Sequence, residues 1–484
     1  MNISFAHYKS RPLIPIFFGV ALGIFISVFT ADTTRWIVSY TAALLILFFS
    51  MMLKNARHYF LTLFFLGILI ITMNYAGTAR ALHVGGPAGF YHTFYDFPLF
   101  MLYILWIPNI FISQTSKFNF SKLDLCILGL IGMSFLSIYN AVNMDYCIYG
   151  IFRLVIMYLS FFYMANAITS KRDVKIILFT LLVGLFCESL LGIIQYLRGE
   201  TFGMALLGES KELVNLEGFK APISRVMGTL GHPNSFATYL GFFIPLSASV
   251  ILAPIKIKYK VLCGLVSLLA ISTLILTLSR GGWLGFIISI IMLISFVIKG
   301  KLFPRKRFLR IVFVGFILLG AIIIAFQGKI SLRLLSDDFG GAYSRIPLMK
   351  VAMNMIEAHP LLGIGNNNYT EVMRGYDDTN EQISYGFPFE VHNGYLLIAS
   401  EIGVVGLFFF LLFVVLLYKK GVSLILSCND KFISFITVGL LAGISSFLVQ
   451  ILFEDVNLVS HLCFIFWVIS GVIVALTRLN TKLS

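Results

Sequence analysis

Arg280 is the residue whose type and surroundings point most directly to chemistry. It stands in LSRGGWLGF, a turn so short that it separates two apolar segments of membrane-spanning length. A guanidinium is a planar fork of N–H donors that can bind two phosphate oxygens at once. Gly281 and Gly282 follow, and glycine allows a ligand to approach the backbone closely. The pattern favours phosphate binding over the alternative of an arginine that extends to lipid headgroups.

His392 is the second candidate, in FEVHNGYLLIASEIGVVGL at the start of an apolar run. A neutral imidazole can accept a proton near pH 7, whereas the alternative role is a helix cap or an interface residue. Gly403 and Gly406 follow in the same run. We expect them to share one helical face and to allow close packing of a neighbouring helix.

Two further polar clusters lie where apolar segments meet long loops. SRVMGTLGHPNSFA contains Arg225, His232 and Asn234, and AYSRIPLMK contains Arg345. Either arginine alone could simply be solvated in its loop. The scarcity of basic residues in these loops makes each one a candidate for anion binding.

The elements that must position these residues are membrane helices. Of 484 residues, 59% are hydrophobic and 12% charged, whereas soluble proteins carry about 25% charged residues. Apolar runs near the roughly 20 residues needed to cross a bilayer recur along the whole chain. We therefore predict an all-α, polytopic membrane bundle of about 12–14 helices. The expected spans are 12–30, 36–53, 58–76, 97–113, 124–141, 148–168, 174–197, 234–254, 259–278, 282–299, 308–326, 394–418, 432–452 and 458–476.

The distribution of charge predicts the orientation. With both termini cytoplasmic, most of the 36 Lys and Arg fall in inner segments and most of the 22 Asp and Glu fall outside. This is the positive-inside pattern, and it explains the net charge of +14 without nucleic-acid binding. The expected regions are N-terminal transmembrane helices at 1–197, an outer loop at 198–233, central helices at 234–326, a large extracytoplasmic loop at 327–391 and C-terminal helices at 392–484.

The large loop contains a predicted amphipathic helix. Ser344 can cap it, the sequence RIPLMKVAMNMIEAH forms it and Pro360 ends it. We expect it to lie on the outer membrane surface, or to be a plain surface helix. Its expected apolar side is formed by Ile346, Met349, Ala352, Met353 and Ile356.

Some ionisable groups fall inside expected spans and need partners there. Arg153, Glu188 and Glu401 could form a proton or ion relay, or tie helices together. The pair Glu454–Asp455 raises the same question. The six cysteines show no paired spacing, so we expect buried thiols and neither disulfides nor a metal site.

In the order in which they occur, these motifs resemble the O-antigen ligase/O-antigen polymerase superfamily of bacterial envelope glycosyltransferases. The resemblance rests on residues 224–407: SRVMGTLGHPNSFATYL, LSRGGWLGF, SRIPLMKVAMNMIEAHPLLGIGNNNY and HNGYLLIASEIGVVGL. The last has the form H-N, nine residues, then G-x-x-G-L. The N-terminal half resembles the family only in its hydrophobicity.

The resemblance implies a GT-C-like, metal-independent, inverting transferase without a cofactor, in the bacterial inner membrane with its active site on the periplasmic face. Its donor would be a glycan on a polyprenyl diphosphate such as undecaprenyl diphosphate. Its acceptor would be a lipid-linked glycan, for a polymerase of O-antigen or exopolysaccharide, or lipid A–core, for a ligase of lipopolysaccharide biosynthesis. Fourteen spans favour the polymerase slightly. Envelope polysaccharide-assembly proteins are possible partners, and a polysaccharide-lipid transporter is the more remote alternative.

The family pattern assigns roles residue by residue. Arg225 and Arg280 match outer-face arginines that grip the diphosphate, and His392 matches a large-loop histidine that activates or orients the acceptor. The expected substrate-binding residues are Arg345, His232, Asn234, Asn393 and Glu390.

Overall fold

The computed structural model describes residues 55–71, 74–76, 86–113, 118–216, 223–335, 345–454 and 456–483. The first two expected spans, 12–30 and 36–53, and the expected cap Ser344 lie outside these residues.

The described residues form a helical bundle, so the prediction of an all-α polytopic membrane protein is confirmed. Ten helices are long and apolar enough to cross a membrane, and two shorter apolar helices precede them. The ten are α5 (Lys122–Leu136, extended by η2, Ser137–Asn140), α6 (Met144–Ala167), α7 (Lys171–Arg198), α8 (Pro233–Leu252), α9 (Ile257–Leu276), α10 (Arg280–Lys299), α11 (Arg305–Ala325), α16 (Gly394–Ser427), α17 (Lys431–Gln450) and α18 (His461–Leu483). The shorter pair is α3 (Ala56–Ile70) and α4 (Asp96–Ser113).

The third expected span is shorter than predicted. The helix ends at Ile70, and β1 (Asn74–Ala76) pairs antiparallel with β2 (Tyr91–Thr93). This ladder supplies partners for backbone groups that a continued helix would otherwise have satisfied internally.

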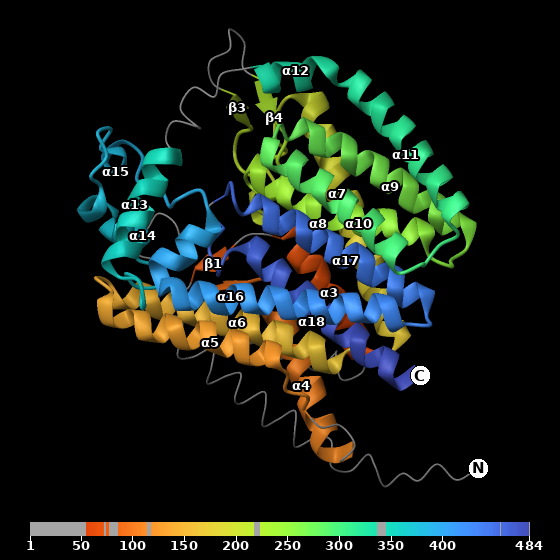
Figure 1. Ribbon diagram of the computed structural model, residues 1–484, viewed down its shortest axis with the longest axis horizontal. Helices are drawn as coiled ribbons and strands as arrows, with labels where there is room; N and C mark the ends of the chain where they lie inside the picture. The colour runs from red at the N-terminus through yellow and green to blue at the C-terminus, as the bar shows by residue number, and fades with distance from the viewer. Residues whose placement is uncertain are drawn as a thin grey trace.

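Small residues let the spans pack closely. Long α16 runs beside α5 and α6, while α7–α10 and α17 form the neighbouring part of the bundle (Figure 1). A Cβ added at Gly443 of α17 would lie 2.1 Å from the carbonyl oxygen of Phe242 in α8, so these two backbones are in direct contact. By contrast, α11 buries only Phe308 and exposes apolar side chains along its length.

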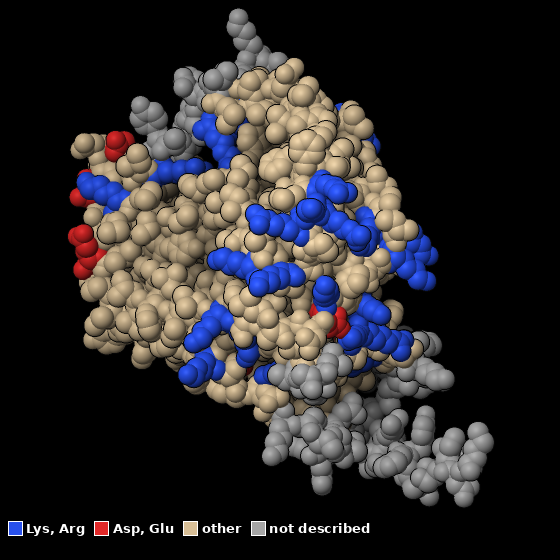
Figure 2. Space-filling view, turned by 45° about the vertical axis from the view of Figure 1, so that its right-hand side comes forward, with Lys and Arg blue, Asp and Glu red and all other residues tan. Residues whose placement is uncertain are grey.

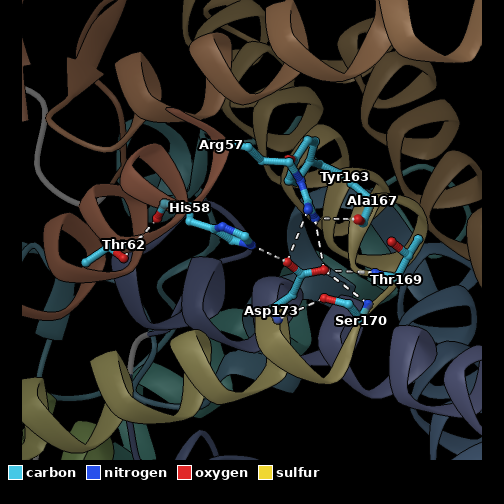
Figure 3. A network of polar contacts seen from close by, with 8 residues as sticks. All are labelled: Arg57, His58, Thr62, Tyr163, Ala167, Thr169, Ser170 and Asp173. Carbon is cyan, nitrogen blue, oxygen red and sulfur yellow. Dashed lines mark hydrogen bonds and ion pairs between the residues drawn. The ribbon is translucent and has the colours of Figure 1, made fainter. Parts of the chain in front are cut away.

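A polar network at one end of the bundle joins α3 to the turn between α6 and α7 (Figure 3). Arg57 donates to the Asp173 carboxylate at 3.1 Å and to the carbonyl oxygen of Ala167 at 2.6 Å. The His58 ring lies 2.9 Å from the same carboxylate, which also caps α7 together with Ser170. The start of α3 and the end of α6 therefore share one end of the bundle, as the alternating spans predict.

The two long loops are folded at the opposite end. The first contains η3 (Ala205–Leu207), β3 (Val214–Leu216) and β4 (Ile223–Arg225), and β3 and β4 pair antiparallel. The second contains α12 (Gln327–Leu335), α13 (Arg345–Ala358), α14 (Tyr369–Val372), η4 (Met373–Tyr376) and α15 (Ile383–Gly386). Figure 1 shows α13–α15 grouped beside the start of α16.

Helix α13 forms where predicted, and three side chains of its expected apolar side are exposed on the protein surface. Ile346 is 75% exposed, and Met349 and Met353 are also exposed. The helix instead buries Leu348 and Met355 in a small second core that it shares with the rest of the large loop and with α16. Packing against α16 selected a face of the helix that periodicity alone did not distinguish.

The cysteines are free thiols. Four are buried and Cys428 is half-buried, but Cys187 is exposed on α7, so the expectation of burial fails there. Its side chain lies on an apolar helix surface that a bilayer would cover.

Candidate active site

Arg225 is held between the first long loop and the turn that joins α9 to α10. It ends β4 and is buried. Its Nε donates to the carbonyl oxygen of Thr277 at 2.8 Å, and a terminal nitrogen donates to Oδ1 of Asn234 at 2.6 Å. The structure thus brings together two of the predicted clusters, and it fixes the orientation of this guanidinium.

Arg280 is the first residue of α10, immediately after the Ser279 cap. Its Nε and one terminal nitrogen donate to the carbonyl oxygen of Arg333, at 3.3 and 2.9 Å. In return, Nε of Arg333 donates to the carbonyl oxygen of Leu278 at 3.0 Å. The two arginines therefore clamp α12 onto the α9–α10 turn, where Leu278 adopts a left-handed φ of 51°.

The α9–α10 turn is consequently the point at which both principal arginines are anchored. Arg225 binds its first residue, Thr277, and Arg280 follows its last, Ser279. The guanidinium of Arg225 is held by a carbonyl of this turn and that of Arg280 by a carbonyl of α12, so both are oriented before any ligand arrives. Such preorganisation is what stabilises developing negative charge most effectively.

The two glycines after Arg280 allow close helix packing as well as the approach of a ligand to the backbone. A Cβ at Gly282 would lie 2.5 Å from Cβ of Ala237, whereas one at Gly281 would make only ordinary contacts with Phe453. Gly282 therefore brings α10 against α8. The expected approach of a ligand to the backbone is sterically easier beside Gly281.

His232 and Asn234 form the start of α8. His232 is exposed and caps the helix, because its Nδ1 accepts from the backbone N–H of Asn234 at 3.3 Å. The carbonyl oxygen of Asn234 accepts from the side-chain amide of Gln450 at 3.3 Å. Asn234 thus connects Arg225 to the end of α17.

His392 lies just before α16, which Asn393 caps. The Asn393 side chain accepts from the backbone N–H groups of Tyr395 and Leu396, both at 3.1 Å. The backbone N–H of Gly394 donates to the carbonyl oxygen of Ile451 at 2.7 Å, which places this helix start against the end of α17. His392 is half-buried, and its ring centre is 6.0 Å from that of Phe387. The same end of α17 thus contacts the starts of α8 and α16.

Glu390 and Arg345 belong to the large loop beside α16. Glu390 is buried near Tyr369, whose pKa is raised by burial first and then by the charges of Glu390 and Glu401. Arg345 begins α13, and its Nε is buried without a hydrogen-bond partner among the residues that the structure describes. No contact in the described part of the chain joins Arg345 to Arg225 or Arg280.

Sequence reasoning missed Arg333 and Gln450. Arg333 orients Arg280 through its backbone, and Gln450 orients Asn234. Arg333 had a usable signal, since it is a basic residue in an expected outer loop. Gln450 had only its polarity at the end of an apolar span.

The ionisable groups within the spans have separate partners. Arg153 binds Asp96 at 2.8 Å, and Glu188 accepts from the backbone and hydroxyl groups of Thr229 at 3.0 and 2.7 Å. Glu401 accepts from the backbone N–H of Tyr369 at 3.4 Å. These contacts fit ties between segments, whereas a relay would need the groups to follow one another.

The backbone of the large loop packs against α16 at the point where this helix is broken. Ile402 and Gly403 are not helical, and Gly403 has a φ of 76°. The backbone of Ile364 donates to the carbonyl oxygen of Ser400 at 2.9 Å, and that of Val404 donates to the carbonyl oxygen of Pro360 at 2.9 Å. The predicted shared helical face of Gly403 and Gly406 is therefore interrupted at Gly403, because the loop backbone occupies that place.

With this geometry in view, the comparison with known families is informative. Residues 265–411 match the family model described as O-antigen ligase. Over this segment the chain is similar to that family. This match confirms the resemblance to the O-antigen ligase/O-antigen polymerase superfamily. No curated protein matches the chain.

The matched segment begins within α9 and ends within α16. It contains Arg280, Arg345 and His392, together with Arg333 and the break in α16. Arg225, His232 and Asn234 precede the matched segment, and Arg225 contacts it through its bond to Thr277. The candidate site is thus built from the matched segment and from the helix start that packs against it.

Proposed function

We propose that this membrane protein is a metal-independent, inverting glycosyltransferase. It moves a glycan from polyprenyl diphosphate to an acceptor sugar hydroxyl at the outer leaflet of the bacterial cytoplasmic membrane. The proposed acceptor is a second lipid-linked glycan, which makes the protein a polymerase of O-antigen or exopolysaccharide. This choice of acceptor rests on the fourteen predicted spans.

The observation that carries the proposal is the anchoring of Arg225 and Arg280 at the α9–α10 turn, next to the matched segment and within it. A diphosphate leaving group gains negative charge as its bond to the sugar breaks. Guanidinium groups held by Thr277 and Arg333 can bind that charge without first being reoriented. The proposed active site lies at the end of the bundle that carries the long loops.

In the proposed reaction, the acceptor oxygen attacks the anomeric carbon of the donor. The bond from that carbon to the diphosphate oxygen breaks, and polyprenyl diphosphate leaves with the bonding electrons. The acceptor proton passes to neutral His392, which acts as a general base. The backbone bonds of Asn393 and Gly394 fix the helix start that positions this ring.

The alternative function is an O-antigen ligase that transfers the glycan to lipid A–core, and the family match is compatible with either function. Both functions use the same donor end, so Arg225 and Arg280 serve either. Reconstitution of the full chain with a lipid-linked repeat alone separates them. A ladder of longer lipid-linked glycans identifies a polymerase.

Transfer that requires added lipid A–core identifies the ligase and contradicts the polymerase. Neither product, from protein shown to be folded by its thermal unfolding transition, contradicts both. In that case a transporter regains support, and movement of the lipid-linked glycan between leaflets becomes the measurement.

A further inference from the structure

A hollow opens between the ends of α5, α16 and α18, at the opposite end of α16 from the candidate active site. Its volume is about 460 Å³. The lining includes three basic side chains from two helices, Lys122, Lys419 and Lys420. Hydroxyl and amide groups complete the polar part, including Ser423 and Asn480.

The charge of this hollow is strongly positive. No carboxylate in the described part of the chain lies within ion-pairing distance of Lys122, Lys419 or Lys420. The nearby carboxylate of Asp124 is buried, and one of its oxygens already accepts from the backbone and hydroxyl groups of Ser121 at 2.7 Å. Three ammonium groups around one recess repel each other, so an anion between them would stabilise all three.

Neighbouring contacts fix the walls of the hollow. Arg478 of α18 donates to the carbonyl oxygen of Asn119 at 2.9 Å and to the side chain of Asn166 at 2.9 Å. It also donates to the carbonyl oxygen of Ala165. These bonds join the segment before α5 to the ends of α6 and α18 beside the hollow.

The lysines lie at the depth of lipid headgroups. Helix α16 has 34 residues, or roughly 50 Å at about 1.5 Å per residue, whereas the hydrocarbon layer is about 30 Å thick. Its start contacts the candidate site, and Lys419 follows Gly394 by 25 positions, or roughly 37 Å of helix interrupted only at Ile402 and Gly403. Lys419 and Lys420 therefore lie beyond the hydrocarbon at the other face. Figure 2 shows that basic side chains gather on the side of the molecule that includes this end, with few acidic ones between them.

We propose that this hollow binds the phosphate headgroup of an anionic phospholipid in the leaflet opposite the candidate active site. Lysine ammonium groups bind phosphate as point charges, and Asn480 can donate a hydrogen bond beside them. The apolar Leu123, Leu416 and Leu424 in the lining provide a surface for the start of the acyl chains. The site is independent of the glycan transfer proposed above.

Titration of the delipidated full-length protein in detergent with phosphatidylglycerol, followed by native mass spectrometry, tests the site. The triple variant Lys122→Gln, Lys419→Gln, Lys420→Gln should bind phosphatidylglycerol about tenfold more weakly or worse, because each lysine near such a headgroup adds attraction. The matched control removes the same charge from the start of α9 at the same end, as Lys256→Gln, Lys258→Gln, Lys260→Gln. The control should bind like the unmodified protein.

An equal loss in both triple variants would show diffuse attraction and overturn the site, as would unchanged binding in the first. Phosphatidylcholine binding as tight as phosphatidylglycerol binding would also overturn it. Displacement of the lipid by millimolar inorganic phosphate would assign the hollow to a soluble phosphate and reject the lipid. If the triple variant unfolds, Lys122→Gln alone, at the exposed start of α5, should still weaken binding measurably.

Discussion

At the scale of single residues, the orientation of Arg280 depends on contacts with another arginine, Arg333. Its guanidinium is oriented by the carbonyl oxygen of Arg333, and the guanidinium of Arg333 is in turn oriented by Leu278. We predict that Arg280→Ala abolishes glycan transfer without loss of expression, because the diphosphate loses an oriented charge. Arg280→Lys should rescue little, since an ammonium cannot replace the planar fork.

The measurement is product formation by the purified protein from a lipid-linked donor. Arg374→Ala is the matched control. That arginine is exposed in the large loop, and its guanidinium lies 5.2 Å from the centre of the Tyr385 ring, so its loss should leave turnover nearly unchanged. Normal turnover in Arg280→Ala would remove Arg280 from the diphosphate site.

The proposed role of His392 as a general base can be tested quantitatively. We predict that His392→Ala lowers the rate of transfer by more than about 100-fold, the lower end of general-base contributions. A loss below about tenfold would leave His392 only a role in positioning the acceptor.

The candidate residues that sequence could reveal are those with an unusual location for their type. Arg280 stood out because basic residues are rare in the expected outer turns. Arg333 and Gln450 could not be assigned roles in the same way, because they act on Arg280 and Asn234 across gaps in sequence that only folding closes.

At the scale of elements, the break in α16 is a feature that cannot be recognised in its apolar sequence. The run from Gly394 to Ser427 is continuous in hydropathy, and nothing in its composition marks Ile402 as non-helical. The break exists because Pro360–Gly365 crosses the helix there and needs hydrogen-bond partners for its own backbone. The buried face of α13 was unpredictable for the same reason, since both depend on which loop segment meets α16.

Gly403 should therefore be far less replaceable than other glycines in the spans. A Cβ there would lie 2.0 Å from the carbonyl oxygen of Leu361. The φ of 76° with a ψ of 169° is also a conformation that essentially only glycine adopts, at a cost of about 1–3 kcal/mol for other residues. We predict that Gly403→Ala lowers the thermal unfolding midpoint markedly and detaches the large loop. Increased proteolysis between residues 359 and 391 would report the detachment.

Gly132→Ala in α5 is the matched control for this change, because a Cβ there meets nothing within 4 Å. It should leave the midpoint unchanged or raise it slightly, since alanine favours helix. Equal stability of the two variants would mean that the break in α16 does not depend on glycine.

At the scale of the whole molecule, sequence predicted the class of fold because hydropathy and charge act over long segments. Twelve of the expected spans correspond to helices of the structure, two of them shorter than the membrane-spanning ten. Successive spans are predicted to cross the bundle in alternating directions. The contact of Arg57 with Asp173 agrees with this order. The orientation in the membrane is a separate matter, because it depends on the bilayer and its surroundings.

The predicted orientation follows from the basic turns alone, and one labelling experiment can test it. Glu381 is exposed in the large loop and Lys258 is exposed in the first turn of α9, at opposite ends of the bundle. In a background without the six native cysteines, Glu381→Cys should react with a membrane-impermeant maleimide once the outer membrane is opened. Lys258→Cys should react only after the inner membrane is broken, because positive charge is retained on the cytoplasmic side. The reverse pattern would place Arg225, Arg280 and His392 in the cytoplasm, where a donor presented at the outer leaflet could not reach them.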